Sequence, residues 1–316
     1  MYYDKILQKI SSDLDSIKNH LKIVPDKFIT IIHIEENIKN YQEFAENELG
    51  LSQATIKNQK SAIRRFLNHS QGIINKETVK KYLESNESTS WKSNQLKALR
   101  KFIRDYLHLG NWINEFEFPR EKAKIKKSIP NDDQLVLFYS KLDYQTQMVF
   151  LILVASGLRI GEVLSLEIDD ISFETNMIDA SKVHKSDTKS SWISFMTNQV
   201  SDFIQIYVKS LHSDKLFPVS YKTVQNNFQR VSKEIGIKIK PHLLRTIFTE
   251  KCTQAGIEEK YIDAFCGRIS QNIIRRHYTD YSPESMRRHY DKAEPFLRLP
   301  LEYGDFSDVR PHHNRI

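Results

Sequence analysis

The sequence predicts a mostly α-helical fold with a small antiparallel β-hairpin, an arrangement of the α+β class. Apolar residues recur at the three- and four-residue spacing of amphipathic helices over most of the chain. Glycine and proline are few, nine of each, whereas a β-sandwich needs many turns. One segment, NMIDASKVHKSDTKSSWISF (residues 176–195), instead has β-branched and aromatic residues on both sides of a polar turn. This pattern predicts a hairpin with its tip near residues 185–189.

The length of the chain favours two domains, because 316 residues are many for one hydrophobic core. We expect an N-terminal helix, a helical domain, a basic linker, a larger second domain and a C-terminal tail, with the boundaries 1–28, 29–118, 119–130, 131–299 and 300–316. The second domain is expected to begin with a helix capped by Asn131 or Asp132. Helices are expected to resume after the hairpin by about Asn198.

The composition favours an intracellular protein with an anionic partner. The net charge is +7 and the pI is near 9.1, which weakly favours nucleic acid or a membrane surface. The longest apolar run, residues 148–155, is far shorter than the ~18 residues that span a bilayer, and the N-terminus has no apolar signal core. Cys252 and Cys266 have no CxxC spacing. We therefore expect a cytoplasmic protein with no membrane contact.

Two helices of the first domain have a clear apolar face. Ser52 is a suitable N-cap for a helix that ends near His69. A second helix is expected over about residues 91–109. The side chains expected to point inward are Ile56, Ile63, Phe66 and Leu67 in the first helix and Leu96, Leu99, Ile103 and Leu107 in the second.

Basic residues recur on the opposite faces of these helices and in the linker. One basic stripe on one helix is usually a solvated face. Two stripes in one small unit, next to a cationic linker, favour a surface that binds DNA phosphates. The stripes consist of Lys57, Lys60 and Arg64, then Lys97, Lys101 and Arg104, and the linker adds Arg120, Lys122, Lys124, Lys126 and Lys127.

Several kinds of phosphate chemistry are missing from the sequence. There is no GxxxxGK[ST] loop, no HExxH and no Cys/His cluster with zinc spacing. Asp169 and Asp170 are adjacent carboxylates, but such a pair far more often caps a helix end than binds magnesium. We expect no metal and no cofactor, so an enzyme of this sequence that acts on phosphates must do so without metal.

Three separated segments carry candidate catalytic side chains. ASGLRIGEVLSL places Arg159 and Glu162 one helical turn apart, and PHLLRTIFTEK places His242 and Arg245 on one face of a helix. GRISQNIIRRHYTDYSPE (residues 267–284) surrounds two tyrosines with arginines and a histidine, although a buried tyrosine prefers apolar neighbours. Each segment alone has a plain structural explanation, such as a helix ion pair or a cap.

In this order, the segments resemble the tyrosine recombinase (phage integrase) family over about residues 30–295. SGLRIGEVLSL is similar to the first arginine segment of that family. Family members usually read LGH where this chain reads CGR, and YIDAFCGRISQNIIRRHY resembles integrases of archaeal viruses and plasmids. The resemblance implies a helical DNA-clamping domain followed by a tyrosine-recombinase catalytic domain.

The resemblance also implies the reaction. Tyr278 would attack the scissile phosphate and form a 3′-phosphotyrosyl link with a free 5′-hydroxyl. Arg159 and Arg245 would bind the non-bridging oxygens, where negative charge builds in the transition state. Lys189 would protonate the leaving oxygen as general acid.

The remaining positions have supporting roles by the same resemblance. His242 would assist proton transfer or bind the phosphate. Arg268 replaces the commoner histidine or tryptophan, so it would donate to the phosphate while its role in proton transfer is in doubt. Glu162 would orient Arg159. Residue spacing leaves Lys182 and Lys185 open as alternatives for the acid, and Tyr281 and Tyr290 as alternatives for the nucleophile.

The expected function is therefore a site-specific recombinase acting on double-stranded DNA. A type IB-like topoisomerase, or a catalytically silent DNA-binding protein of the same fold, is the alternative. We expect the protein to work at the nucleoid as a dimer or tetramer with other copies of itself. The C-terminal segment could dock on another copy or pack on its own domain, and its apolar candidates for docking are Met286, Tyr290, Ala293, Phe296 and Leu297.

Overall fold

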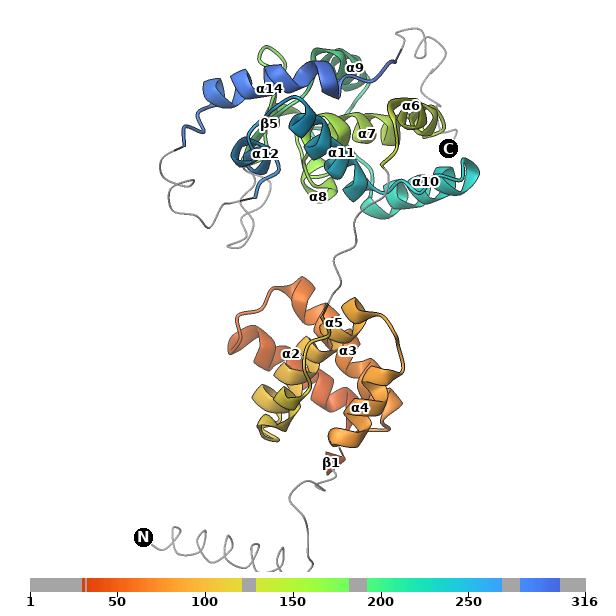
Figure 1. Ribbon diagram of the computed structural model, residues 1–316, viewed down its shortest axis with the longest axis vertical. Coiled ribbons are helices and arrows are strands. Elements are labelled where there is room, and N and C mark those ends of the chain that lie inside the picture. Colours follow the sequence, from red (N-terminus) through yellow and green to blue (C-terminus); the bar gives the residue numbers. More distant parts are fainter. Residues whose placement is uncertain (1–29, 32, 121–128, 182–191, 269–278, 302–316) are drawn as a thin grey trace, which may run out of the picture. The chain divides into compact units, whose positions relative to one another are not determined.

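A computed structural model describes residues 30–31, 33–120, 129–181, 192–268 and 279–301 of the chain. The chain divides into two compact units, Met1–Ile125 and Lys126–Ile316 (Figure 1). Each unit has its own hydrophobic core. The mostly helical fold with a small antiparallel sheet is confirmed. The expected N-terminal helix over residues 1–28 and the hairpin tip lie outside the described residues.

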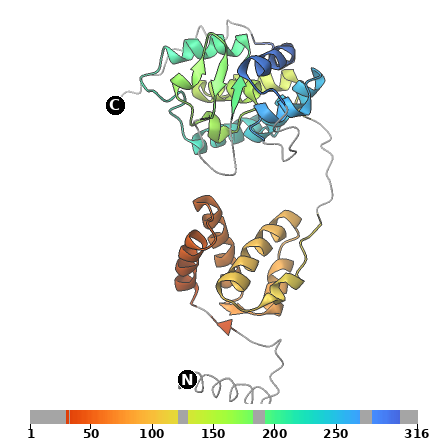
Figure 2. The same cartoon turned by 90° about the vertical axis from the view of Figure 1, so that its left-hand side faces the viewer.

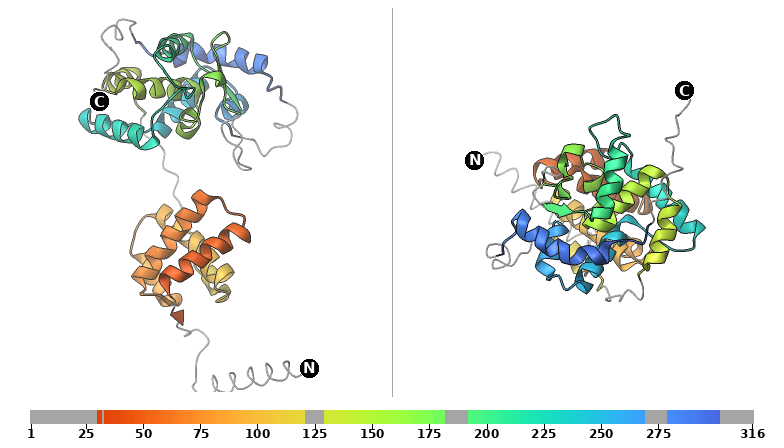
Figure 3. Two further views of the ribbon diagram at one scale, coloured as in Figure 1. Left: turned by 180° about the vertical axis from the view of Figure 1, so that it is seen from behind. Right: turned by 90° about the horizontal axis from the view of Figure 1, so that it is seen from above.

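The first unit is a set of helices with a short β-ribbon. Strand β1 (Thr30–Ile31) pairs antiparallel with β2 (Ile73–Ile74). Helix α3 packs against both α2 and α5, and the left panel of Figure 3 shows α2 and α3 side by side. Within its described residues, the helical elements of this unit are α2 (Ile34–Asn47), α3 (Gln53–His69), α4 (Lys76–Glu84), α5 (Thr89–Arg100), the π-helical η2 (Lys101–Tyr106) and the 3-10 turn η3 (Asn111–Glu115).

Helix α3 begins and ends where the sequence predicts. The Ser52 hydroxyl accepts a hydrogen bond from the backbone N–H of Thr55 at 3.4 Å, which satisfies one of the helix's unpaired donors. The four expected inward residues are all buried: Ile56, Ile63, Phe66 and Leu67.

The prediction of one continuous α-helix over residues 91–109 is wrong. Helix α5 begins earlier, at Thr89, and at Lys101 it passes into the π-helix η2, in which the Leu107 N–H donates to the Phe102 carbonyl at 2.9 Å. The wider π turn lets the adjacent Phe102 and Ile103 both be buried. Three expected inward residues are buried, whereas Leu107 is partly exposed.

The second unit surrounds one mostly buried helix. It contains α6 (Asp132–Ser140), α7 (Tyr144–Ser156), the short α8 (Ile160–Val163), the 3-10 turn η4 (Ile168–Asp170), α9 (Asn198–Val208), α10 (Tyr221–Glu234), α11 (Pro241–Gln254), α12 (Glu259–Phe265) and α14 (Pro283–Leu297). Helix α7 is buried on all sides over its last nine residues, and α9 and α11 pack against it. Of the two expected caps for α6, the structure uses Asn131, whose side chain accepts the Gln134 N–H at 2.9 Å.

The predicted hairpin is confirmed as two strands of a three-stranded antiparallel sheet. Strand β4 (Met177–Asp179) pairs with β5 (Ile193–Phe195), with Met177 opposite Phe195. A third strand, β3 (Ile171–Ser172), adds to the other side of β4 and was not predicted. Figure 2 shows these strands as green arrows among the helices of this unit.

Helix α14 packs on its own unit. Met286, Tyr290, Ala293 and Leu297 fill a core with residues of α11, α12 and β5. The Tyr290 hydroxyl also donates to the Ala155 carbonyl at 2.8 Å. Of the two alternatives for this segment, the structure shows packing on its own domain, because the helical spacing of these four residues places them on the buried face. Of the five candidates only Phe296 is exposed, at 45%.

A glycine between α7 and α8 is required by both backbone and packing. Gly157 has φ +68°, and a Cβ there would lie 2.4 Å from the Phe248 ring. We expect Gly157→Ala to destabilise the second unit by about 2–5 kcal/mol, the sum of a left-handed backbone and an overpacked core. The free energy of unfolding from urea titrations measures this.

Gly236→Ala is the matched control. Gly236 has nearly the same backbone, φ +71°, but a Cβ there meets nothing within 4 Å. Gly236→Ala should therefore lower the free energy of unfolding by only about 1–2 kcal/mol, the cost of a left-handed backbone. Equal losses of unfolding free energy in the two variants would show that the Phe248 ring moves aside for the new Cβ at no energetic cost.

Candidate active site

Arg159 is fixed by a buried carboxylate at the start of α8. Glu162 is fully buried, and its two oxygens accept the Arg159 backbone N–H at 2.6 Å and the Arg159 Nη1 at 2.7 Å. Both bonds form within one helical turn, so they hold the guanidinium in one orientation. The Arg159 side chain is still 33% exposed. The Arg159 guanidinium can therefore bind a ligand at the surface while the buried Glu162 carboxylate holds it in place.

Arg245 is the buried cation of the site. It lies in the second turn of α11 and is 3% exposed. Its Nη1 donates to the Gly157 carbonyl at 2.8 Å, and its Nη2 donates to the Cys266 carbonyl. Among the described residues no carboxylate lies within ion-pair distance of it. A buried charge without a counter-charge is costly, so this position favours an anionic ligand.

Arg268 directly follows the turn that ends α12. Its backbone N–H donates to the Asp263 carbonyl at 2.8 Å, and its Nη1 forms an ion pair with the Asp263 carboxylate at 3.1 Å. Gly267, at φ +56°, makes the turn that brings the chain back to this position. Because 45% of the side chain is exposed, Arg268 is the most accessible of the three guanidiniums.

Arg245 joins the segments that carry the other two arginines, because it donates to Gly157, two residues before Arg159, and to Cys266, two residues before Arg268. Burial is the main cause that lowers the pKa of Arg245 from its ordinary value, and the Cys266 thiol opposes this effect. Arg159 and Arg268 lower that pKa further, while Glu162 raises it. A guanidinium stays protonated in spite of such shifts. Three segments distant in sequence therefore bring positive charge to one place.

His242 lies one turn before Arg245 on α11, as the sequence predicts. Pro241 occupies the first helical position, where its missing N–H costs nothing. His242 is exposed while Arg245 is buried. The helix thus has a histidine at the surface and an arginine beneath it.

The predicted nucleophile and general acid lie outside the described residues. This holds for Tyr278 and Lys189, and also for the alternative acids and the linker lysines: Lys182, Lys185, Lys122, Lys124, Lys126 and Lys127. Tyr290 is excluded as a nucleophile, because it is fully buried and burial raises its pKa well above the ordinary value. Tyr281 is partly exposed and packs against the Tyr261 ring.

The structure also reveals contacts that no sequence pattern indicated. The Trp192 indole donates to the Tyr281 carbonyl at 3.4 Å, while the Trp192 carbonyl accepts the Ala180 N–H at 3.1 Å. Trp192 thus joins the base of the hairpin to the segment that follows Tyr278. The sequence also did not indicate the carbonyls that hold Arg245. Every residue has a backbone carbonyl, so residue types do not mark which one accepts a hydrogen bond.

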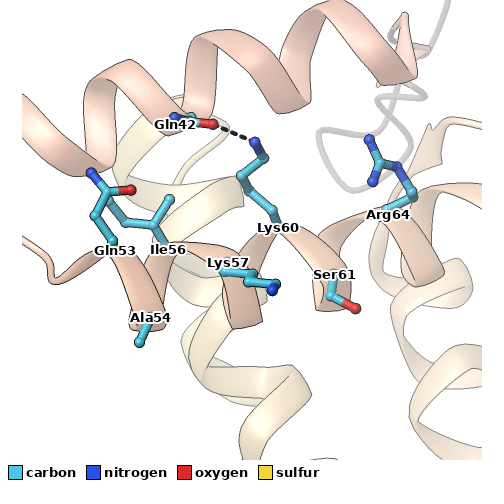
Figure 4. A pocket seen from close by; sticks show the side chains of 8 residues that line it. All are labelled: Gln42, Gln53, Ala54, Ile56, Lys57, Lys60, Ser61 and Arg64. Carbon is cyan, nitrogen blue, oxygen red and sulfur yellow. Dashed lines mark hydrogen bonds between the residues drawn. The ribbon is translucent and has the colours of Figure 1, made fainter. Parts of the chain in front are cut away.

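The basic stripe on α3 lines a groove between α2 and α3. The groove has a volume of about 570 Å³ and contains Lys57, Lys60 and Arg64 (Figure 4). Two of these cations are already engaged, since Lys60 donates to Gln42 and Arg64 pairs with Glu35 at 2.8 Å. Lys57 is exposed, and within the described residues it forms no ion pair or side-chain hydrogen bond.

The stripe on α5 is less regular. Lys97 is exposed and lines a second groove, between α3 and α5. Lys101 is half-buried where the π-helix begins, and Arg104 pairs with its neighbour Asp105. Lys97 is therefore the residue of this stripe that is best placed to bind a phosphate.

The described residues include no group of three or more His, Cys, Asp or Glu side chains placed to hold a metal ion. Asp170 caps the turn η4 by accepting the Glu167 N–H at 2.9 Å, the structural role expected for this carboxylate pair. Among the described helices, none has the length and apolar character that a bilayer span requires.

Comparisons with known proteins agree with this geometry. The chain is 25% identical over 260 residues to tyrosine recombinase XerA of Saccharolobus solfataricus, covering 77% of this chain and 88% of that protein. It is 23% identical over 277 residues to tyrosine recombinase XerA of Thermococcus onnurineus, covering 82% and 96%. These relatives are archaeal, and each alignment includes most of both chains.

The fold is similar to that of solved integrases. A lambda integrase (residues 75–356) dimer bound to a COC′ core site has a TM-score of 0.62 with 16% identity, and the match covers 76% of this chain and 96% of that chain. At this identity the likeness concerns the fold alone. Residues 131–285 match the phage integrase family, and they contain every described member of the arginine site. The second unit therefore contains a phage integrase family domain.

Proposed function

We propose that this protein is a site-specific DNA recombinase that cleaves and rejoins DNA through a 3′-phosphotyrosyl intermediate without a metal ion. The observation that carries the proposal is the buried Arg245 guanidinium, which has two carbonyl partners and no carboxylate among the described residues. Arg159 and Arg268 add charge beside it. A DNA phosphate is an anion that can accept hydrogen bonds from all three.

The arginine site suits the transition state better than the ground state. When an oxygen attacks the phosphate, negative charge grows on the non-bridging oxygens, and fixed guanidinium donors stabilise it. Arg159 is held by Glu162, and Arg245 by Gly157 and Cys266. Because these donors are oriented before the substrate binds, little reorganisation is needed during the reaction.

The covalent step is balanced as a transfer between two oxygens. The Tyr278 oxygen forms a bond to phosphorus as the bond to the 5′-oxygen breaks. Lys189 gives a proton to that leaving oxygen, and the tyrosine proton passes to a base or to water. Religation is the reverse attack, by a 5′-hydroxyl from another strand. Both residues are assigned here from the sequence.

Recombination is favoured over relaxation of DNA by a topoisomerase. The archaeal relatives described above are named recombinases, and a Staphylococcus aureus relative, 23% identical over 167 residues, is named transposase A from transposon Tn554. The structural relative is a dimer on its DNA site. We therefore propose that this protein also works as an assembly of copies on double-stranded DNA, at the nucleoid.

Tyr278→Phe should abolish the covalent adduct with DNA and leave the Kd for DNA near normal. The phenolic oxygen carries out the chemistry but adds little to an interface dominated by phosphate contacts. Incubation with a nicked suicide substrate, followed by a denaturing gel, measures the adduct. Tyr281→Phe is the control and should still form it. An adduct that disappears with Tyr281→Phe and persists with Tyr278→Phe would transfer the role to Tyr281.

Cleavage should continue in EDTA. The charge stabilisation that metal ions provide in other phosphoryl-transfer enzymes is assigned here to arginines 159, 245 and 268. The measurement is the single-turnover rate of adduct formation with EDTA and with added magnesium. A strict magnesium requirement for one cleavage event would refute the mechanism.

Glu162→Gln should slow adduct formation about 10- to 100-fold, because a charge-assisted hydrogen bond worth about 1.5–3 kcal/mol is weakened. The matched control is Asp263→Asn, which removes the partly exposed carboxylate beside Arg268. It should change the rate only a few-fold, because exposed ion pairs are worth about 0–1 kcal/mol. Melting curves separate loss of rate from loss of folding. Equal effects in the two variants would deny Glu162 a special role.

A further inference from the structure

Helix α3 lies between two grooves of similar size. The groove between α2 and α3 has a volume of about 570 Å³, and the groove between α3 and α5 about 540 Å³. Ser61 lines both of them. The two grooves differ in character, because three cations and two side-chain amides line the first, whereas four side-chain amides and two cations, Arg65 and Lys97, line the second.

Most amides in these grooves are already hydrogen-bonded inside the protein. In the first groove Lys60 donates to Gln42, and Gln53 donates to Glu46 at 2.5 Å. In the second, the Tyr41 hydroxyl donates to Gln59 at 2.6 Å and the Tyr82 hydroxyl donates to Gln95 at 2.9 Å. These four glutamines serve to hold the unit together.

Two asparagines differ from them. Asn58 and Asn94 are exposed, both line the α3–α5 groove, and neither side chain is hydrogen-bonded to another described residue. An amide has a donor and an acceptor side by side, which is the complement of an adenine edge in the major groove. We infer that Asn58 and Asn94 determine the DNA sequence that the protein prefers, each by contacting an adenine. This inference rests on the proposed function, because it needs DNA as the partner.

The placement of the two amides fits DNA bound over the face that α3 and α5 share, with α3 in the major groove and Asn94 reaching a base from the neighbouring helix. Asn58 and Ser61 are three residues apart on α3, and Asn94 and Lys97 are three residues apart on α5, so each pair shares a helix face. The two helices pack directly against each other. The major groove is about 12 Å wide and admits one α-helix, and the 17 residues of α3 extend about 25 Å.

The charges around the groove also fit DNA. No aspartate or glutamate lines either groove, and two carboxylates beside the first groove are already engaged, Glu35 with Arg64 and Glu46 with Gln53. A lysine bound to a phosphate does not read sequence, whereas an asparagine that contacts both atoms of a base edge discriminates between bases. This divides the surface into lysines that set affinity and asparagines that set preference.

The test is selection of preferred sequences by the full-length chain from a pool of random DNA duplexes. Asn58→Ala and Asn94→Ala should each lower an adenine preference at one position by about 5- to 150-fold, the equivalent of 1–3 kcal/mol. Affinity for non-specific DNA and its dependence on salt should stay the same. Both residues are exposed, so melting temperatures should not change.

Two controls separate base reading from general binding. Asn68→Ala removes an exposed asparagine of the same helix that lines neither groove, and it should keep the wild-type preference. Lys57→Gln should reduce the slope of log K against log salt by about 0.9 per lost contact without changing the preference.

The outcomes distinguish this inference from the proposed function. If Asn58→Ala and Asn94→Ala keep the wild-type preference, or only reduce the salt slope, the inference is wrong while the recombinase proposal stands. If the wild-type chain neither binds duplex DNA nor forms an adduct, the proposed function fails.

Discussion

The second unit depends on holding one charged side chain in its interior. Arg245 is 3% exposed, and its guanidinium donates to the carbonyls of Gly157 and Cys266. These two acceptors belong to chain segments more than a hundred residues apart, one at the end of α7 and one at the end of α12. The carbonyls orient the guanidinium but do not neutralise its charge. The fold thus stabilises a buried cation whose charge a bound anion can neutralise.

The packing around this arginine explains why the neighbouring positions are so restricted. Gly157 needs a left-handed backbone and has no room for a Cβ against Phe248. Phe248 lies one turn after Arg245 on α11, so the helix that carries the arginine also presses against the turn that accepts its hydrogen bond. Burial of α7, α11 and α14 therefore supports the geometry of the site as well as the stability of the unit.

The first unit shows a different use of charge. Lys57, Arg64 and Lys97 are exposed there, and two cations of α3, Lys60 and Arg64, are paired with residues of α2. DNA binding would exchange these contacts for phosphates at small cost, because exposed pairs are weak. The two units thus combine a buried cation, suited to chemistry, with exposed cations, suited to reversible binding along a duplex.

The sequence by itself determined the fold class, the α3 helix with its Ser52 cap, the β4–β5 hairpin and the positions of Arg159, His242 and Arg245 on their helices. These features depend on local spacing, which residue types record directly. Tertiary structure decided the rest. The π turn after Lys101 arises from burying Phe102 and Ile103 together. The burial of Tyr290, which removes it as a nucleophile, arises because α14 packs on α11, α12 and β5. Only the folded chain could show that backbone carbonyls hold Arg245. The same is true of Asn58 and Asn94, which have no hydrogen-bond partner among the described residues. Such contacts join residues far apart in sequence, so they follow from packing and not from composition or periodicity.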